Sequence, residues 1–331
     1  MRFTLSAEQR SFAEALDSLL GGAGVPATAR AWAAGDHGPG RKLWSRLAGL
    51  GVTALRIPEA SGGVGGSCLD VAVAFEQLGR HAVPGPWIET AVLAPALPAG
   101  TPRLDEIAAG ELLVSVAAPP HTPRALDADT ADRVLLLDGR ELSAAAAGKA
   151  RTSMDPTRRL FEVVRGEPLG TVPADHAAQA LDAATLACAA MLLGAGERLL
   201  AETVAYAGAR RQFGRVIGEY QAVKHALADV RVRLDFARPL VHGAALELEA
   251  GTGDAPRDVS AAKVACSDAA YLAARTALQI HGAIGYTLEF DLSLWLLKVR
   301  ALRGAWGTPA VHRARVLDAL TRAVAPVPDR R

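Results

Sequence analysis

The chain has 331 residues, of which 50% are hydrophobic and 21% are charged, so it can bury large cores and is not an intrinsically disordered protein. Its formal net charge of +1 excludes a strong electrostatic attraction to nucleic acid or to an anionic membrane. The first residues lack a signal-peptide core and no apolar run reaches membrane-spanning length, so we expect a cytoplasmic protein with neither nucleic acid nor membrane as a partner.

The amino-terminal part of the chain is predicted to be helical. Ser6-Ala7-Glu8-Gln9 has the pattern of a capping box, and Phe12 and Leu16 follow on one apolar face of the helix that it opens. A tight glycine loop at 57–66 lacks the Lys-Ser/Thr ending of a phosphate-binding loop, so we assign no such loop here. The next helix is predicted from Leu69 to Arg80.

The pattern changes from helical to alternating after Glu111. Leu112, Val114 and Val116 alternate with other residues, and the apolar run 134–137 enters a tight turn at Asp138-Gly139. A further strand is expected over 161–164. Residues 111–173 are therefore predicted to form a small β domain.

Helical periodicity returns near Ala178 and continues to the end of the chain. The first long helix is predicted to end near Gly208, and the second to begin near Gln221 and to be kinked at Pro239. Four helices joined by short loops predict a bundle.

The third and fourth helices of this bundle have their own start signals. Asp258 is a candidate N-cap for the third helix, which is expected to extend to Leu278. Thr308-Pro309 opens the fourth helix with proline at its first position. Its inner face is expected to contain Val311, Val316 and Leu320.

Two glycine-bounded stretches lie between these long helices. The first is Arg210-Arg211-Gln212-Phe213-Gly214, continuing to Tyr220-Gln221, and the second runs from Gln279 to Thr287. An arginine before such a turn can present a cation and free backbone N–H groups to a diphosphate or a carboxylate. The alternative is that these are ordinary helix-ending glycines.

The three cysteines and one charged turn complete the candidate polar sites. Cys68, Cys188 and Cys266 lie far apart without ligand spacing, which predicts buried free thiols and no metal site. The segment Asp155-Pro156-Thr157-Arg158-Arg159 is predicted to be a solvated turn, with a contact to a phosphate group as the alternative. Trp295 and Trp306 are expected either in the core or over a cavity.

Taken together, these motifs resemble the acyl-CoA dehydrogenase family over nearly the whole chain. The resemblance implies a mainly α fold with a small central β domain: an N-terminal helical domain at 1–110, a shortened β domain at 111–173 and a C-terminal four-helix bundle at 174–331. The motifs that carry it, besides the two glycine-bounded stretches, are Leu227-Ala228-Asp229, Glu289, Gly307-Thr308, Ile57-Pro58-Glu59 with Gly62-Gly63, and Phe75-Glu76-Gln77-Leu78-Gly79.

The resemblance also implies FAD as the cofactor, bound across a subunit interface. Arg210 is expected near the pyrophosphate and adenosine end, Gln279 and Gly282 at the pyrophosphate, and Phe213 beside the adenine. These are residues that a family member lends to the FAD of a neighbouring chain. The complete predicted cofactor-binding set is Arg210, Gln212, Phe213, Gln221, Gln279, Gly282, Ala283 and Thr308.

The family elements that hold the flavin ring within one chain are not found. A Thr-Glu-Pro-x-x-Gly-Ser-Asp-like stretch usually opens the β domain, but Val116-Ala117-Ala118-Pro119-Pro120 stands there. A Trp-Ile-Thr-like strand is also not found between Glu111 and Pro173. The resemblance therefore implies a chain that does not hold the reactive ring itself.

The catalytic base of the family is missing as well. Family members remove the α-proton of an acyl thioester with a Glu before the Gly-Thr of the last helix, and Trp306 occupies that position here. The alternative family position on the first bundle helix is Ala184, beside Thr185. No catalytic residue is therefore assigned. Asp182, the nearest carboxylate, and a residue of a partner are the remaining candidate bases.

The resemblance implies the shorter, non-catalytic subunit of a heterotetrameric α2β2 flavoprotein oxidoreductase of lipid metabolism. A larger acyl-CoA dehydrogenase subunit is the expected partner, and the reaction is the α,β-dehydrogenation of an acyl-CoA thioester, bulky or sterol-derived. One alternative is a homo-oligomeric flavoenzyme of the same fold, formed by self-association, which acts on a non-CoA biosynthetic substrate. The other is a flavin-free scaffold or binding protein.

Overall fold

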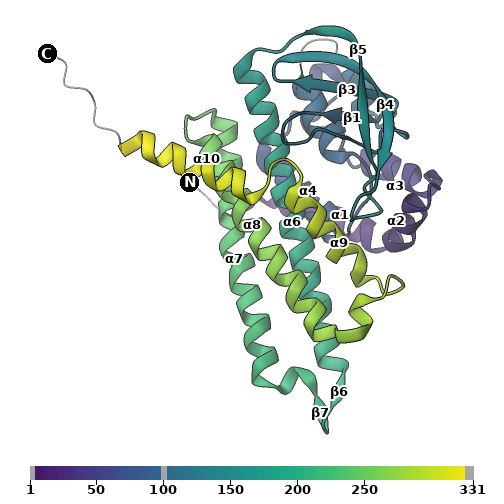
Figure 1. Cartoon of the computed structure of the whole chain (residues 1–331), viewed down its shortest axis with the longest axis vertical. Coiled ribbons are helices and arrows are strands. Elements are labelled where there is room, and N and C mark those ends of the chain that lie inside the picture. Colours follow the sequence, from purple (N-terminus) through teal and green to yellow (C-terminus); the bar gives the residue numbers. More distant parts are fainter. Residues whose placement is uncertain (1–3, 98–102, 325–331) are drawn as a thin grey trace, which may run out of the picture.

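A computed structural model describes residues 4–97 and 103–324 of the chain. Figure 1 shows three long helices, α6, α7 and α8, running along the longest axis, with a small sheet beside the upper part of α6 and the amino-terminal helices behind and below that sheet. This mainly helical architecture with a small central sheet confirms the predicted fold class. The division at residues 110 and 173 stays a prediction.

The amino-terminal helices begin as the sequence predicts. The side chain of Ser6 accepts a hydrogen bond from the backbone of Gln9 at 3.2 Å and the side chain of Gln9 accepts one from the backbone of Ser6 at 3.0 Å, which confirms the capping box. The elements of this part are α1 (Ala7–Gly21), α2 (Val25–Ala33), α3 (Gly38–Ala48), η1 (Glu59–Ser61), α4 (Cys68–Arg80), η2 (Glu89–Leu93), η3 (Ala94–Ala96) and α5 (Leu104–Ala108).

The sheet has five strands in the order β1-β3-β4-β5-β2, with β1 parallel to β3 and the other pairs antiparallel. Asp138 pairs with Glu141 across a two-residue turn in which Gly139 has φ +62, as the Asp-Gly pattern predicts. The strands are β1 (Val114–Ala117), β2 (Ala125–Leu126), β3 (Arg133–Asp138), β4 (Glu141–Arg151) and β5 (Leu160–Thr171). All three predicted strand segments are confirmed.

The carboxyl-terminal part contains one helix more than predicted. Helix α9 was missed because its apolar run is short and is interrupted by Lys298 and Arg300, although Lys298 is in fact buried. The elements are α6 (Ala174–Ala209), β6 (Arg211–Gln212), β7 (Arg215–Val216), η4 (Ile217–Glu219), α7 (Gln221–Ala250, containing Pro239), α8 (Ala255–His281), η5 (Gly282–Tyr286), α9 (Leu292–Gly304) and α10 (Pro309–Val324).

Two local predictions for these helices were wrong. Helix α8 begins at Ala255 with Asp254 at the N-cap position, so Asp258 lies in its first turn. Pro256 also lies in this turn, where its missing N–H group costs no hydrogen bond of the helix. On α10, Val311 and Leu320 are 36% and 49% exposed. Figure 1 shows α10 leaving the bundle at an angle, so only part of one side of it is covered.

Helix α6 is the core of the bundle. By length and composition it could span a membrane, with a mean hydropathy of 1.4 in its most apolar stretch, so the prediction that no run reaches that length was wrong. In the structure 78% of that stretch is buried within the protein. A helix that is apolar on all sides is expected in the core of a large domain as well as in a membrane.

Helices α4 and α6 cross with their backbones in contact. A Cβ atom at Gly79 would lie 2.0 Å from the carbonyl oxygen of Met191, and one at Gly194 would lie 1.9 Å from the carbonyl oxygen of Glu76. Glycine therefore permits this close approach. Arg238 of α7 fastens the crossing from one side, since its guanidinium contacts Glu76 at 2.6 Å and Glu197 at 2.8 Å.

Candidate functional site

The end of α6 carries an exposed tip. After Ala209 the chain turns through the β6–β7 hairpin, and the backbone N–H of Ile217 donates to the carbonyl of Arg210 at 2.8 Å. Phe213, with φ +51, and Gly214, with φ +84, form the turn. Phe213 is 92% exposed, so its ring is free to contact another molecule.

The end of α8 lies beside this tip. His281 is buried and its ring stacks on Tyr206 of α6 with the ring centroids 4.2 Å apart. Its Nδ1 is 2.8 Å from the carbonyl oxygen of Ala277, so His281 fills the turn rather than facing solvent. Tyr206 is one helical turn before Arg210, and His281 is two residues after Gln279, so the two glycine-bounded stretches meet at one end of the bundle (Figure 1).

Most of the predicted cofactor-binding residues are gathered at this end. Arg210, Gln212, Phe213, Gln221, Gln279, Gly282 and Ala283 belong to the tip and to the adjoining turn η5. Thr308 does not: it directly precedes α10 and lies two residues after Trp306. Among the described residues, the side chains of Arg210 and Gln279 form no hydrogen bond or ion pair. A free cation, a free amide and a glycine turn fit the chemistry of a diphosphate.

Trp306 stands at the position predicted for the family's catalytic base. Trp306 is 3% exposed, and its φ of +57 is uncommon for a bulky residue. Its backbone N–H donates to Oγ1 of Thr122 at 3.3 Å, and its carbonyl lies 2.9 Å from Nε2 of His312. The surrounding residues therefore hold the indole in a conformation that a free chain would rarely adopt.

The other two positions considered for a base, Asp182 and Ala184, offer no free carboxylate. Asp182 is buried, and both of its carboxylate oxygens are engaged by Arg315, at 2.5 and 2.9 Å. Ala184 is fully buried in the core. Arg315 was missed in the sequence, since nothing in the local pattern of α10 pairs it with a residue more than a hundred positions earlier.

Trp306 and Asp182 line a cavity of about 340 Å3 between the sheet and the bundle. A second cavity, of about 260 Å3, lies on the other side of the loop that follows β1. His121 and Thr122 line both cavities and separate them. Pockets for drug-sized ligands occupy roughly 300–1,000 Å3, and a whole FAD molecule is larger than such a ligand. The cavity beside Trp306 is at the lower end of this range.

The tip and the two cavities lie far apart along α6. Asp182 and Arg210 lie on and at the end of the same straight helix, roughly 40 Å apart at about 1.5 Å per residue. Figure 1 shows the corresponding separation between the sheet and the β6–β7 tip. Within one chain, the tip and these cavities therefore cannot form a single site.

His312 links stability to pH at this site. Burial lowers its pKa from the ordinary 6.5 to about 4. The unfolded chain therefore binds a proton that the folded chain refuses, and the free energy of unfolding falls as the pH drops from 6.5 to 4. Replacing His312 by Gln, which keeps a donor for the Trp306 carbonyl, should reduce that loss by about 3 kcal/mol.

Urea unfolding of both proteins at several pH values measures this difference. Burial raises the pKa of Glu89 and of Asp127 to about 7, so these carboxyls give a slope of opposite sign, but they are the same in both proteins and cancel in the comparison. Parallel pH profiles for the two proteins would show that His312 does not titrate in this range.

The turn predicted to be solvated is buried instead. Asp155 and Thr157 are each 1% exposed, because the turn packs under α9, where Nζ of Lys298 donates to Oγ1 of Thr157 at 3.0 Å and lies 3.4 Å from Asp155. A turn-forming sequence carries no signal for such burial. The three cysteines are buried free thiols, as predicted. Residues 4–97 and 103–324 contain no group of three His, Cys, Asp or Glu side chains that could hold a metal ion.

A helical amino-terminal domain, a small central sheet and a carboxyl-terminal helical bundle define the class of flavoprotein oxidoreductases that dehydrogenate acyl thioesters. Comparison with known proteins agrees. The model of the acyl-CoA dehydrogenase N-terminal domain matches residues 6–106, and that of the C-terminal domain matches residues 174–321. The acyl-CoA dehydrogenase IpdE2 of Mycobacterium tuberculosis is 36% identical over 87% of this chain and 89% of its own length. The chain belongs to the acyl-CoA dehydrogenase family.

Solved structures show the same fold at low sequence identity. A chain of the Tcur3481-Tcur3483 steroid ACAD G363A variant has a TM-score of 0.85 at 21% identity, covering 98% of this chain and 100% of its own. A chain of the ChsE4-ChsE5 complex from Mycobacterium tuberculosis has a TM-score of 0.81 at 22% identity, covering 99% of this chain and 100% of its own. The family prediction is confirmed.

Proposed function

We propose that this chain is the non-catalytic subunit of a mixed α2β2 acyl-CoA dehydrogenase, in which it completes the FAD site of a larger partner subunit. The reaction is the α,β-dehydrogenation of an acyl-CoA thioester. Bound FAD accepts the hydride from the β-carbon, and a carboxylate of the partner takes the α-proton. The shared fold of this chain with chains of a steroid ACAD and of the ChsE4-ChsE5 complex supports a mixed assembly.

One observation carries this proposal. The side chains expected to contact a partner's FAD form no contact within this chain, whereas the positions expected for a catalytic base are occupied by a buried indole and by an ion-paired carboxylate. The guanidinium of Arg210 and the amide of Gln279 are exposed and unpaired among the described residues. Trp306 fills the position of the base, and Asp182 is bound by Arg315. In the assembly Arg210 neutralises the diphosphate, Gln279 donates to it, and the backbone at Gly282 approaches it closely.

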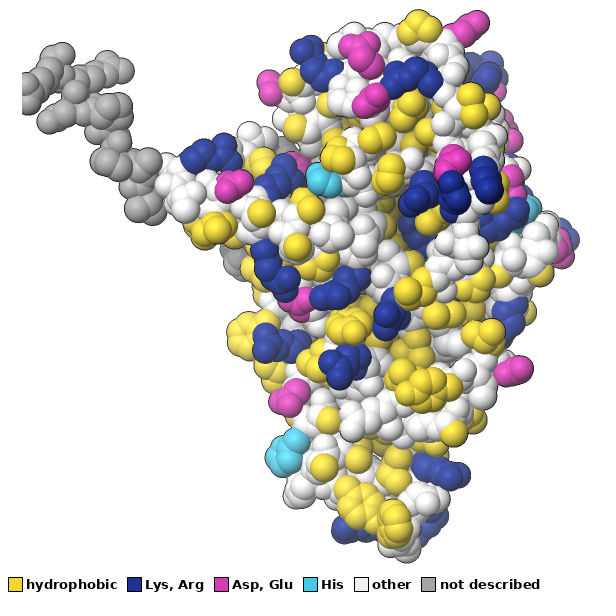
Figure 2. Space-filling view, in the orientation of Figure 1, with side chains coloured by type: hydrophobic (Ala, Val, Ile, Leu, Met, Phe, Trp, Pro, Cys, Tyr) yellow, Lys and Arg dark blue, Asp and Glu magenta, His cyan; other side chains and the backbone are white. Residues whose placement is uncertain are grey.

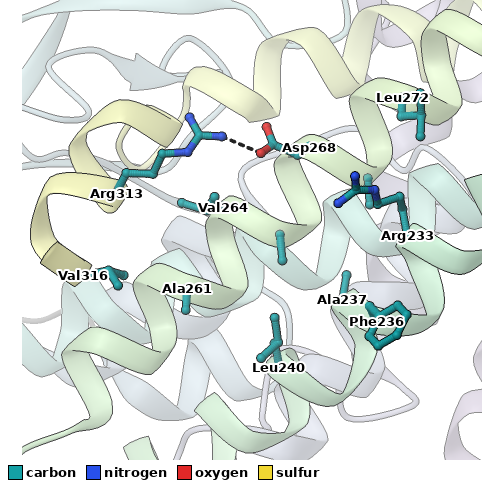
Figure 3. A pocket seen from close by; sticks show the side chains of 12 residues that line it. Arg233, Phe236, Ala237, Leu240, Ala261, Val264, Asp268, Leu272, Arg313 and Val316 are labelled. Carbon is teal, nitrogen blue, oxygen red and sulfur yellow. Dashed lines mark hydrogen bonds and ion pairs between the residues drawn. The ribbon is translucent and has the colours of Figure 1, made fainter. Parts of the chain in front are cut away.

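An apolar groove supports association with other subunits. It measures about 690 Å3 and runs between α7, α8 and α10. Figure 3 shows Phe236 and Leu240 of α7 and Val316 of α10 on its sides, with the ion pair of Arg313 and Asp268 at one end. Phe236 is 73% exposed and Leu240 is 44% exposed, which is a large apolar surface to leave in water.

The proposed substrate is supported by one structural relative. A chain of similar fold belongs to a protein described as a steroid ACAD, which favours a bulky, sterol-derived acyl group. We place the activity in cytoplasmic lipid metabolism. Trp306 and the cavity beside it then serve no chemistry of their own in this chain.

Expression alone and together with a full-length acyl-CoA dehydrogenase subunit tests the proposal. The isolated chain should be colourless and inactive, whereas the mixture should show flavin absorbance and should reduce an electron acceptor with a sterol-derived acyl-CoA. Flavin per pair of unlike chains, measured after gel filtration, should be about one molecule. An active acyl-CoA dehydrogenase formed by the isolated chain would overturn the proposal.

A second candidate is favoured by the cavity of about 340 Å3 beside Trp306: a homo-oligomeric flavoenzyme that acts on a substrate without CoA. The same experiment distinguishes this candidate from the first, because a homo-oligomeric flavoenzyme should be yellow when the chain is expressed without a partner. A flavin-free scaffold requires a colourless protein in every mixture.

A further inference from the structure

The cavity of about 260 Å3 lies where the loop after β1, the turn after β4 and the end of α9 meet. Arg124, Thr122, Thr152 and Arg158 are among the residues that line it, and none of the lining residues is acidic. Figure 2 shows Lys and Arg side chains gathered over this part of the surface, at the end of the sheet nearest α9. The cavity therefore offers hydroxyl and guanidinium donors without a carboxylate among its lining residues.

Arg158 is the buried cation of this cavity. It is 9% exposed, and its backbone N–H donates to the carbonyl of Asp155 at 3.0 Å. Its guanidinium donates no hydrogen bond to any residue in the described ranges 4–97 and 103–324. None of its guanidinium nitrogens is among the fully buried polar atoms that lack a partner, and Arg158 lines the cavity, so these N–H groups can donate to an acceptor that enters it.

The acidic residues nearby do not supply that acceptor. Asp155 lies 3.4 Å from the ammonium of Lys298 and accepts from Thr157, so it is already paired. Neither Glu89 nor Asp127 forms an ion pair with Arg158 in the part of the chain that the structure describes, and burial raises the pKa of both to about 7. Among the described residues, no carboxylate therefore lies within ion-pair distance of the Arg158 guanidinium.

We propose that this cavity binds a phosphate or carboxylate group, with the guanidinium of Arg158 as the main contact. A planar guanidinium binds two oxygens of such a group at once, which gives both strength and orientation. The hydroxyl of Thr122 keeps its hydrogen free for the ligand, since its oxygen accepts from Trp306, and Arg124 is exposed at the entrance. The site is separate from the tip at Arg210 and does not depend on the role proposed for that tip.

The volume limits the ligand to a small one. At about 260 Å3 the cavity is just below the roughly 300 Å3 at which pockets for drug-sized molecules begin. A free small anion fits entirely, and a larger nucleotide would insert only one phosphate group. These are two sources of the same chemistry.

Titration calorimetry of the complete chain with inorganic phosphate, at constant ionic strength, tests this site. The wild-type chain should bind phosphate saturably at one site. Arg158→Gln should weaken binding at least about 10-fold, because it removes a charged bidentate contact. Lys149→Gln is the matched control: it removes the same charge from the nearby exposed end of β4 without touching the cavity, and it should leave the affinity unchanged.

Absence of saturable binding by the wild-type chain, or equal binding by Arg158→Gln, would overturn the proposal. If Arg158→Gln does not fold, Arg124→Gln at the exposed entrance takes its place, and an unchanged affinity in that variant would count against the site. Competition then identifies the source. Displacement of phosphate by FAD or by coenzyme A assigns the group to a nucleotide, and persistence of phosphate binding at saturating FAD and coenzyme A assigns a small free anion.

Discussion

Arg210→Ala should weaken FAD binding by the mixed assembly roughly 10- to 150-fold, the value of hydrogen bonds between a cation and an anion. Arg210 is exposed at the end of α6 and its guanidinium has no partner within the described residues, so its loss leaves the fold intact. Under the proposed function, the FAD affinity falls because the diphosphate of the partner's cofactor loses its contact with the guanidinium. Fluorescence titration of the flavin-free assembly with FAD measures it.

Arg211→Ala is the matched control for this variant. It removes the same charge from the next residue, whose guanidinium donates to the carbonyl of Gly214 within its own hairpin at 3.2 Å. FAD affinity should be nearly unchanged in this control. Equal losses in the two variants would mean that the tip acts through its overall charge, and an unchanged affinity in Arg210→Ala would remove the tip from the flavin site.

Gly194→Ala should lower the free energy of unfolding by about 3 kcal/mol or more, the upper end of the range for an overpacked core. The new Cβ would lie 1.9 Å from the carbonyl oxygen of Glu76 and 2.8 Å from the backbone nitrogen of Arg80. Both atoms belong to the backbone of α4, which has no flexible side chain to move aside. Helix α4 must therefore separate from α6, which also disturbs the partly buried ion pairs of Arg238.

Gly208→Ala in the same helix separates this clash from helix propensity. A Cβ at Gly208 would meet nothing within 4 Å. Alanine is favoured over glycine in a helix, so this variant should be as stable as the wild type or more stable by up to about 1 kcal/mol. Urea unfolding followed by circular dichroism measures both variants. A Gly194→Ala protein as stable as Gly208→Ala would show that the two backbones do not touch.

The long, straight α6 explains why one chain can be half of two sites. The cavity lined by Asp182 and Trp306 lies near the amino-terminal end of α6, and the exposed tip follows its carboxyl-terminal end. Because α6 is packed on several sides by α4, α7 and α8, its two ends cannot be brought together by bending. Under the proposed function, the tip therefore contributes only to a flavin site that a neighbouring chain holds.

Local patterns predicted most of the elements. The capping box at Ser6, the alternation before Gly139 and the start of α10 at Pro309 each depend on residues close together in the chain, so they can be read without the fold. Helix α9 was not predicted, because Lys298 interrupts its apolar pattern. Lys298 is buried only because it contacts Asp155 and Thr157, and no local pattern connects it to these residues.

The sequence by itself determined the family, the fold class and the presence of the two glycine-bounded stretches, because motifs and periodicity are properties of neighbouring residues. The tertiary structure alone decided that Asp182 is held by Arg315, that Trp306 is locked in place, and that Arg158 is buried beside a cavity. It also decided that the tip and the cavity beside Trp306 lie far apart. The physical reason is that burial and charge pairing arise between segments distant in the chain, whose approach depends on how whole helices and the sheet pack.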